Sequence, residues 1–212
     1  MSLLVHDGVL VPPSRFDLGG PGGGSSAGSG QEPPVATANP ARLGLWLLLG
    51  TITMLFIGFT SALLVRRVSS DWIPMAPPAV LWANTAALLA SSVTLELARR
   101  GLRLVRYGTA VRFVAATGIL GALFVAGQLR LWSALGAQGV YLSVNPHSDF
   151  FFVLTGVHVA HVLAALTWYL VVLVKLTRRA YAPGSDALGL FATFWHFLGV
   201  LWVYLLFALF IL

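Results

Sequence analysis

Three histidines lie in long apolar stretches, where an ionisable side chain is costly and therefore marks a candidate functional site. They are His158, His161 and His196. Because His158 and His161 are three residues apart, a helix would place them on one face, an arrangement that suits a metal ion better than a haem. A metal would also need a third ligand and carboxylates behind it, and the two stretches carry no acid in their central parts. The pattern favours neutral histidines that each donate one interhelical hydrogen bond.

Glu96 is the one carboxylate well inside an apolar stretch, which makes it the candidate membrane carboxylate and raises the question of proton transfer. Arg99 and Arg100 follow it by three and four residues, so a local ion pair at the membrane boundary is a sufficient account. Four further polar residues can hydrogen-bond between helices, namely Asn84, Thr85, Gln128 and Thr155. The sequence shows no nucleophile with a base, no phosphate loop and no cysteine, so it predicts no catalytic site and no thiolate metal site.

Five apolar segments must position these residues. The chain has 212 residues, of which 58% are hydrophobic and 9% charged, whereas a soluble domain carries about 25% charge. The segments cover residues 43–65, 79–98, 113–132, 150–174 and 187–212. Lipid-exposed backbone must satisfy its own hydrogen bonds, so the sequence predicts an all-α polytopic membrane protein, a bundle of five transmembrane helices. Asp149 is expected to cap the fourth helix.

Basic residues are distributed unequally between the two sides of the predicted bundle. If the N-terminus is cytoplasmic, that side holds Arg15, Arg42, Arg99, Arg100, Arg103, Arg106, Arg112, Lys175, Arg178 and Arg179, and the other holds Arg66, Arg67 and Arg130. The positive-inside rule therefore predicts a cytoplasmic N-terminus and a C-terminus outside. It also accounts for the net charge of +6 with lipid headgroups, and no nucleic-acid partner is expected.

Residues 1–40 differ from the rest in composition. Gly, Pro, Ser and Ala dominate residues 18–30, and such a sequence cannot bury a core. We expect a flexible cytoplasmic tail, with tethering to a partner as an alternative, followed by a transmembrane domain over residues 41–212. Small residues recur at four-residue spacing within that domain, at Gly118, Ala122 and Ala126 and at Ala86 and Ala90. They fit internal helix packing or, alternatively, docking against another subunit.

Two segments around the membrane histidines resemble motifs of the cytochrome c oxidase subunit III family. Residues 155–162, T-G-V-H-V-A-H-V, are similar to T-G-x-H-x-x-H-V, and residues 195–202, W-H-F-L-G-V-L-W, to W-H-F-V-D-x-V-W. The matching positions are Thr155, Gly156, His158, His161, Trp195, His196, Phe197 and Trp202. Residues 46–62 and 88–94 are also similar to family stretches, so the resemblance covers about residues 43–212. It resembles the short bacterial form with five helices.

The resemblance has three departures, each at a position where the family carries a carboxylate. Ile52, Leu131 and Gly199 stand at these positions. In the family such carboxylates are connected with lipid contact and with proton supply to the catalytic subunit. The departures argue against a direct proton role of this chain, while packing and lipid holding remain expected.

The resemblance implies a non-catalytic subunit of a respiratory haem-copper oxidase in the bacterial inner (plasma) membrane. The complex would reduce oxygen and pump protons, while the haems and copper, and therefore all cofactors, would lie in partner subunits. Subunit I is the main expected partner, with subunit II, phospholipids and, left open, small subunits or a supercomplex. The motif residues are expected to pack and hydrogen-bond the helices. Alternatives are an accessory subunit of a nitric oxide reductase, a stand-alone membrane haem b protein, and a small channel or transporter. The electron donor, cytochrome c or quinol, stays open.

Overall fold

The computed structural model describes residues 40–140, 145–179 and 186–212. The chain divides into two units, residues 1–37 and residues 38–212, and the first lies outside the described residues. The predicted flexible tail therefore remains a prediction. The described helices all belong to the second unit.

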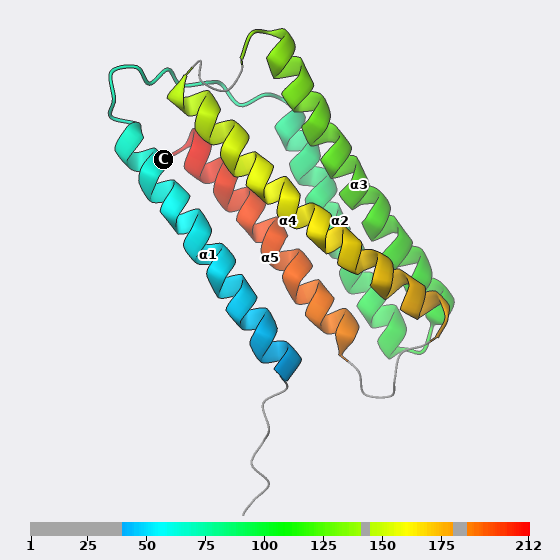
Figure 1. The fold of residues 1–212 in the computed structure, drawn as a ribbon. Coiled ribbons are helices and arrows are strands. Elements are labelled where there is room, and N and C mark those ends of the chain that lie inside the picture. Colours follow the sequence, from blue (N-terminus) through cyan, green and yellow to red (C-terminus); the bar gives the residue numbers. More distant parts are fainter. Residues whose placement is uncertain (1–39, 141–144, 180–185) are drawn as a thin grey trace, which may run out of the picture. The chain divides into compact units, whose positions relative to one another are not determined.

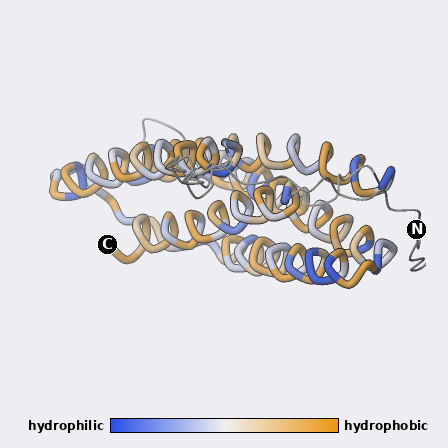
Figure 2. The backbone as a smooth tube through the Cα atoms, turned by 90° about the horizontal axis from the view of Figure 1, so that it is seen from below, coloured by the Kyte–Doolittle hydropathy of each residue, from blue (hydrophilic) through white to orange (hydrophobic). Residues whose placement is uncertain are grey.

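Every regular element in the described part of the chain is an α-helix. The helices are α1 (Pro40–Arg66), α2 (Val80–Arg103), α3 (Tyr107–Ala137), α4 (Pro146–Thr177) and α5 (Ala187–Phe210) (Figure 1). All five are long and apolar enough to cross a membrane, which confirms the predicted fold class. Hydrophilic residues gather mainly toward the helix ends (Figure 2).

The first four helices extend beyond the predicted spans. α3, for example, has 31 residues where the sequence predicted residues 113–132. At 1.5 Å per residue such a helix is about 46 Å long, whereas the hydrocarbon core is about 30 Å thick. The apolar pattern marks the segment inside the lipid, so it misses the turns that continue into the polar interface.

The start of α4 corrects the expected cap. Asn145 is the N-cap, and its side-chain oxygen accepts a hydrogen bond from the backbone N–H of His147 at 3.1 Å. Pro146 occupies the first helical position, where its missing N–H costs nothing. The helix therefore begins four residues before the predicted span, and Asp149 lies within its first turn.

Four of the helices form a ring. α2 contacts α3, α3 contacts α4, α4 contacts α5, and α5 returns to α2. α1 lies against α4 and α5, and within the described residues it contacts neither α2 nor α3. Half of the most apolar window of α5 is buried, compared with 28% for α1, so α5 is the most enclosed helix of the bundle.

Glycines of α3 allow the ring to close tightly. A Cβ on Gly118 would overlap the Tyr169 ring of α4, and one on Gly121 would come within 2.7 Å of the Trp195 ring of α5. Because a side chain at either position would push a neighbouring helix away, these glycines set the close approach of three helices.

The small residues that recur at four-residue spacing on α2 and α3 are partly buried in the bundle and partly exposed on its surface. Gly118 is buried, in agreement with internal packing. Ala122 and Ala126 of α3 and Ala86 and Ala90 of α2 are exposed on this chain. Internal packing therefore explains only the first member of the α3 series.

Candidate functional site: the histidine motifs and their helix contacts

Two tryptophans of the second motif join α5 to α2. The indole N–H of Trp195 donates to the hydroxyl of Ser91 at 2.9 Å, and that of Trp202 donates to the hydroxyl of Thr85 at 3.0 Å. The tryptophans are seven residues apart, about two helical turns, so both lie on one face of α5. Both are buried, and each forms a hydrogen bond to another helix.

The acceptor hydroxyls are oriented by their own helix. Ser91 donates its proton to the carbonyl of Leu88 at 2.6 Å, and Thr85 donates to the carbonyl of Leu81 at 2.7 Å. A hydroxyl has one proton and two lone pairs, so these side chains can only accept from the indoles. The interhelical bond is thus directional, and no polar atom of the pair is left without a partner.

The same arrangement recurs at two other helix contacts. Thr155 of the first motif donates to the carbonyl of Phe151 at 2.6 Å and accepts from Trp132 of α3 at 3.2 Å. Thr60 of α1 accepts from the phenol of Tyr204 in α5 at 2.9 Å. The predicted interhelical bonding of Thr85 and Thr155 is confirmed, as is that of Asn84 and Gln128, which bond each other at 3.3 Å.

His158 is enclosed by aromatic rings instead of hydrogen-bond partners. Its side chain is fully buried, with ring centroids 5.2 Å from Trp202 and 5.9 Å from Phe124. Neither ring nitrogen has a hydrogen-bond partner among the described residues. The expected interhelical hydrogen bond is not formed, because the neighbouring helices present ring carbons at this position.

His161 points to a different neighbour. Its Nδ1 lies 2.7 Å from the carbonyl oxygen of Val157 in the same helix, so Nδ1 carries the proton and donates. Its ring lies 6.0 Å from Phe56 of α1, whereas His158 lies against α3 and α5. The two histidines therefore diverge. Nowhere in the described ranges do three His, Asp or Glu side chains converge as a metal would require.

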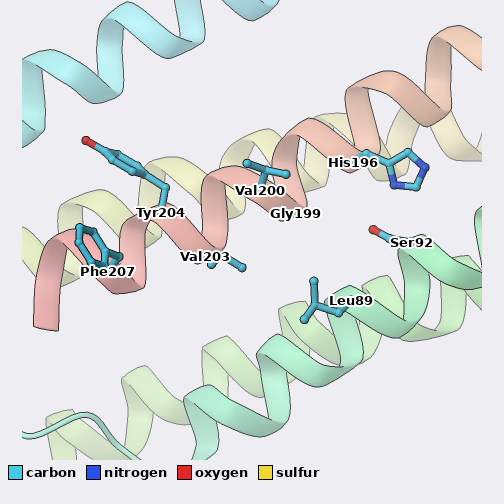
Figure 3. A pocket seen from close by; sticks show the side chains of 8 residues that line it. All are labelled: Leu89, Ser92, His196, Gly199, Val200, Val203, Tyr204 and Phe207. Carbon is cyan, nitrogen blue, oxygen red and sulfur yellow. The ribbon is translucent and has the colours of Figure 1, made fainter. Parts of the chain in front are cut away.

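His196 lies apart from both, in a groove between α2 and α5. Ser92 lies across the groove from it, and Gly199, one turn further along α5, leaves room between them (Figure 3). Phe197, the next motif residue, packs half-buried against the core, and Gly156 of the first motif has open space where a Cβ would lie. The motif thus combines buried bonding residues with one histidine that faces outward.

Glu96 forms the predicted ion pair at the boundary of α2. Its carboxylate lies 2.8 Å from Nη1 of Arg99 and 3.9 Å from Nε of Arg100. All three side chains belong to one helix end and are partly exposed. The local pair is confirmed.

Comparison with known proteins gives the same assignment as the motifs. A model of the family described as cytochrome c oxidase subunit III matches residues 32–212. The chain belongs to this family. It is 33% identical over 168 residues to the cytochrome bo(3) ubiquinol oxidase subunit 3 of Pseudomonas aeruginosa, which covers 76% of this chain and 79% of the relative. It is 29% identical to the quinol oxidase subunit 3 of Bacillus subtilis, covering 77% and 82%, and 27% identical to a probable quinol oxidase subunit 3 of Staphylococcus saprophyticus, covering 82% and 90%.

As a subunit III, the chain is a non-catalytic member of an oxidase complex and associates with other oxidase subunits. Two of the positions where it lacks a family carboxylate are buried in its apolar core. Ile52 of α1 is 4% exposed and Leu131 of α3 is 3% exposed. A carboxylate without a partner would be costly there, so the apolar residues suit their surroundings.

The sequence patterns did not single out another histidine of this subunit III, His147, which forms hydrogen bonds to two distant segments. His147, in the first turn of α4, is 2% exposed. The backbone N–H of Met75 donates to its Nδ1 at 2.7 Å, so Nε2 carries the proton and donates to the carbonyl of Leu209 at 3.0 Å. The neutral imidazole thereby joins the α1–α2 connection, the start of α4 and the end of α5.

Asn145 reinforces the same junction. Its side-chain N–H donates to the carbonyl of Ile73 at 2.6 Å, and its oxygen accepts from the N–H of Ile73 at 3.2 Å. The dipeptide Asn145-Pro146 is a recognisable helix-start signal and could have located the cap. The contact with residues 72 positions away could not have been found from local sequence.

Proposed function

We propose that this chain is subunit III of a respiratory haem-copper terminal oxidase in the cell's inner membrane, with its N-terminus in the cytoplasm. It packs against the catalytic subunit I, and subunit II completes the core of the complex. The complex reduces oxygen and pumps protons, while this chain keeps subunit I stable and holds phospholipids at its surface. The haems and copper reside in the partner subunits.

One observation carries the proposal of a structural role. The residues of the two motifs are used mainly within the bundle, as hydrogen bonds from Trp195 and Trp202 to α2 and as ring contacts of His158. A stand-alone haem b protein would instead need two histidines facing one plane. His158 and His161 turn toward different helices, which disfavours that alternative.

The experiment is purification in mild detergent through a tag on this chain, with an optical spectrum and mass spectrometry of the co-eluting proteins. We expect a haem-copper subunit I with reduced-haem bands, and a colourless chain once the two are separated. A chain that elutes alone with its own Soret band would refute the proposal. Co-elution of a nitric oxide reductase would support that alternative instead.

Quinol is the proposed electron donor, since the relatives are named as quinol or ubiquinol oxidase subunits. Oxygen consumption by the purified complex should be fast with a reduced short-chain quinol and slow with reduced cytochrome c. The reverse preference would contradict this part of the proposal and leave the subunit assignment intact.

A further inference from the structure

The outward face of α5 forms one side of a groove with α2. The groove has a volume of about 560 Å³ and is lined by Leu89, Ser92, His196, Gly199, Val200, Val203, Tyr204 and Phe207 (Figure 3). The exposed Val200, Val203 and Phe207 make its length apolar. It continues past Phe207 along the same two helices toward Trp82 and Phe210. A long apolar chain can therefore follow it.

Two polar side chains interrupt this apolar surface. Neither the imidazole of His196 nor the hydroxyl of Ser92 has a hydrogen-bond partner among the described residues, although the charges of Glu96 and Arg99 are close enough to act on His196. The adjacent Ser91 and Trp195, on the buried sides of the same helices, bond each other. Inside a membrane an unpartnered polar group is costly, so the outward pair is suited to a ligand that supplies the missing partner.

The depth of the pair restricts the ligand. His196 is the tenth residue of α5, roughly 14 Å along a helix of about 36 Å. With α5 centred in a hydrocarbon core of about 30 Å, this level lies about 10 Å from the nearer border, where phospholipid headgroups remain. The Glu96–Arg99 pair follows Ser92 by one turn or more toward that border. The complementary ligand thus carries hydrogen-bonding oxygens on a group that resides inside the membrane, attached to an apolar tail.

Gly199 leaves space between the two helices that form the groove. Hydrogen bonds from Trp195 and Trp202 hold α5 against α2, so the groove is a crease between two touching helices. Gly199 is the smallest residue that lines the groove, and a Cβ at this position would meet only the Ser92 hydroxyl, at 3.5 Å.

We propose that this groove binds a membrane quinone or quinol. The ring lies over Gly199, with one ring oxygen hydrogen-bonded by His196 and Ser92, and the isoprenoid tail follows Val200, Val203 and Phe207. A neutral imidazole serves both forms, since its N–H donates to a quinone carbonyl and its other nitrogen accepts from a quinol hydroxyl. The proposal concerns binding alone and goes beyond the structural role of the chain in the oxidase.

The test uses the whole complex, purified through a tag on this chain and placed in phospholipid nanodiscs. An azido-substituted short-tail ubiquinone is photolysed on it, and the labelled peptides are mapped by mass spectrometry with and without excess decylubiquinone. We expect labelling within residues 89–96 and 196–207 that decylubiquinone suppresses. Labelling confined to other subunits, or groove labelling that excess decylubiquinone does not reduce, would overturn the proposal.

Variants distinguish a built site from general partitioning into lipid. His196→Phe removes the polar contact, and Gly199→Leu fills the groove without removing one, so each should lower groove labelling about tenfold. Ser92→Ala should lower it about threefold. Ser133→Ala on α3 is the matched control, since that hydroxyl is exposed and bonded only to its own helix, and labelling should not change.

Two results would contradict the site even when the complex is intact. One is equal labelling in all four variants, and the other is a groove that crosslinks only to a photoactivatable phospholipid or to a partner helix. Haem co-purification, read on the same samples, reports assembly separately. Its loss in the unmodified protein would refute the proposed function, whereas retained haem without groove labelling would refute only this inference.

Discussion

Two buried histidines of α4, three turns apart, are held in opposite ways. His147, near the helix start, has both ring nitrogens bonded to backbone groups of other segments. His158, in the middle of the helix, has neither nitrogen bonded to any described residue and is surrounded by rings. His158, in the motif, therefore contributes packing, whereas His147, outside the motif, forms hydrogen bonds that join separate segments.

The difference shows at which depth of a membrane bundle a polar side chain can form hydrogen bonds to the backbone of other segments. At a helix end, backbone groups of connections and termini lack intrahelical partners and can bond a side chain. In mid-membrane every backbone group is already bonded within its helix. A histidine placed there can share a carbonyl of its own helix, as His161 does with Val157, but from other helices it meets only side chains, and around His158 these are aromatic.

The largest effect should come from His147→Phe. The ring volume is nearly kept, but the N–H of Met75 and the carbonyl of Leu209 lose their partner, which costs about 2 to 3 kcal/mol. A lower unfolding temperature of the purified complex in detergent would show it. His147→Gln, which can still accept and donate hydrogen bonds, should recover part of the loss. Equal unfolding temperatures of the two variants would contradict the stabilising role of the His147 hydrogen bonds.

Trp195→Phe should have the next largest effect, since it tests a bond that is interhelical and fully buried. It removes the indole N–H that Ser91 accepts and leaves a small cavity, for a loss of about 1 to 2 kcal/mol. In the double variant with Ser91→Ala, the two losses should be less than additive when measured by thermal unfolding. Full additivity would mean that the hydrogen bond contributes nothing.

His158→Phe should change stability by less than about 1 kcal/mol, because the removal of two buried ring nitrogens that have no hydrogen bond offsets the cost of fitting the larger phenyl ring. The matched comparison is His147→Phe, which is the same substitution on the same helix. A loss at position 158 as large as at position 147 would show that His158 has a polar partner in the assembled complex.

The smallest effect concerns a charged pair in solvent, Arg66 and Asp71, 2.7 Å apart. The Ser69 hydroxyl, then the backbone and Arg66, hold the pKa of the Asp71 carboxyl below its ordinary value. A lowered pKa means that this carboxylate stabilises the fold above its unfolded pKa, and that the contribution disappears as pH falls through the folded pKa. Because the group is fully exposed, Asp71→Asn should leave the unfolding temperature at neutral pH nearly unchanged and remove only a slight acid dependence. A large drop would contradict this.

Composition and apolar pattern were sufficient to predict five helices, because length and hydrophobicity alone decide what can span lipid. They could also predict the Glu96 pair, since its partners are on the same helix. The roles of His147 and His158 could not be predicted, because they depend on which distant segments face them. The sequence shows that burying a histidine is costly, whereas only the structure shows whether neighbouring groups offer its ring nitrogens hydrogen bonds.

The position of α1 has a consequence for how the chain is made. Its neighbours in the bundle are α4 and α5, and α4 begins about 80 residues after α1 ends. At roughly 5 to 20 residues per second, synthesis takes on the order of 4 to 16 s to reach it. During that interval α2 and α3 can already pair as a hairpin, while α1 has only lipid around it. A chaperone or insertase that shields single helices would therefore act on this first helix more than on any other described helix.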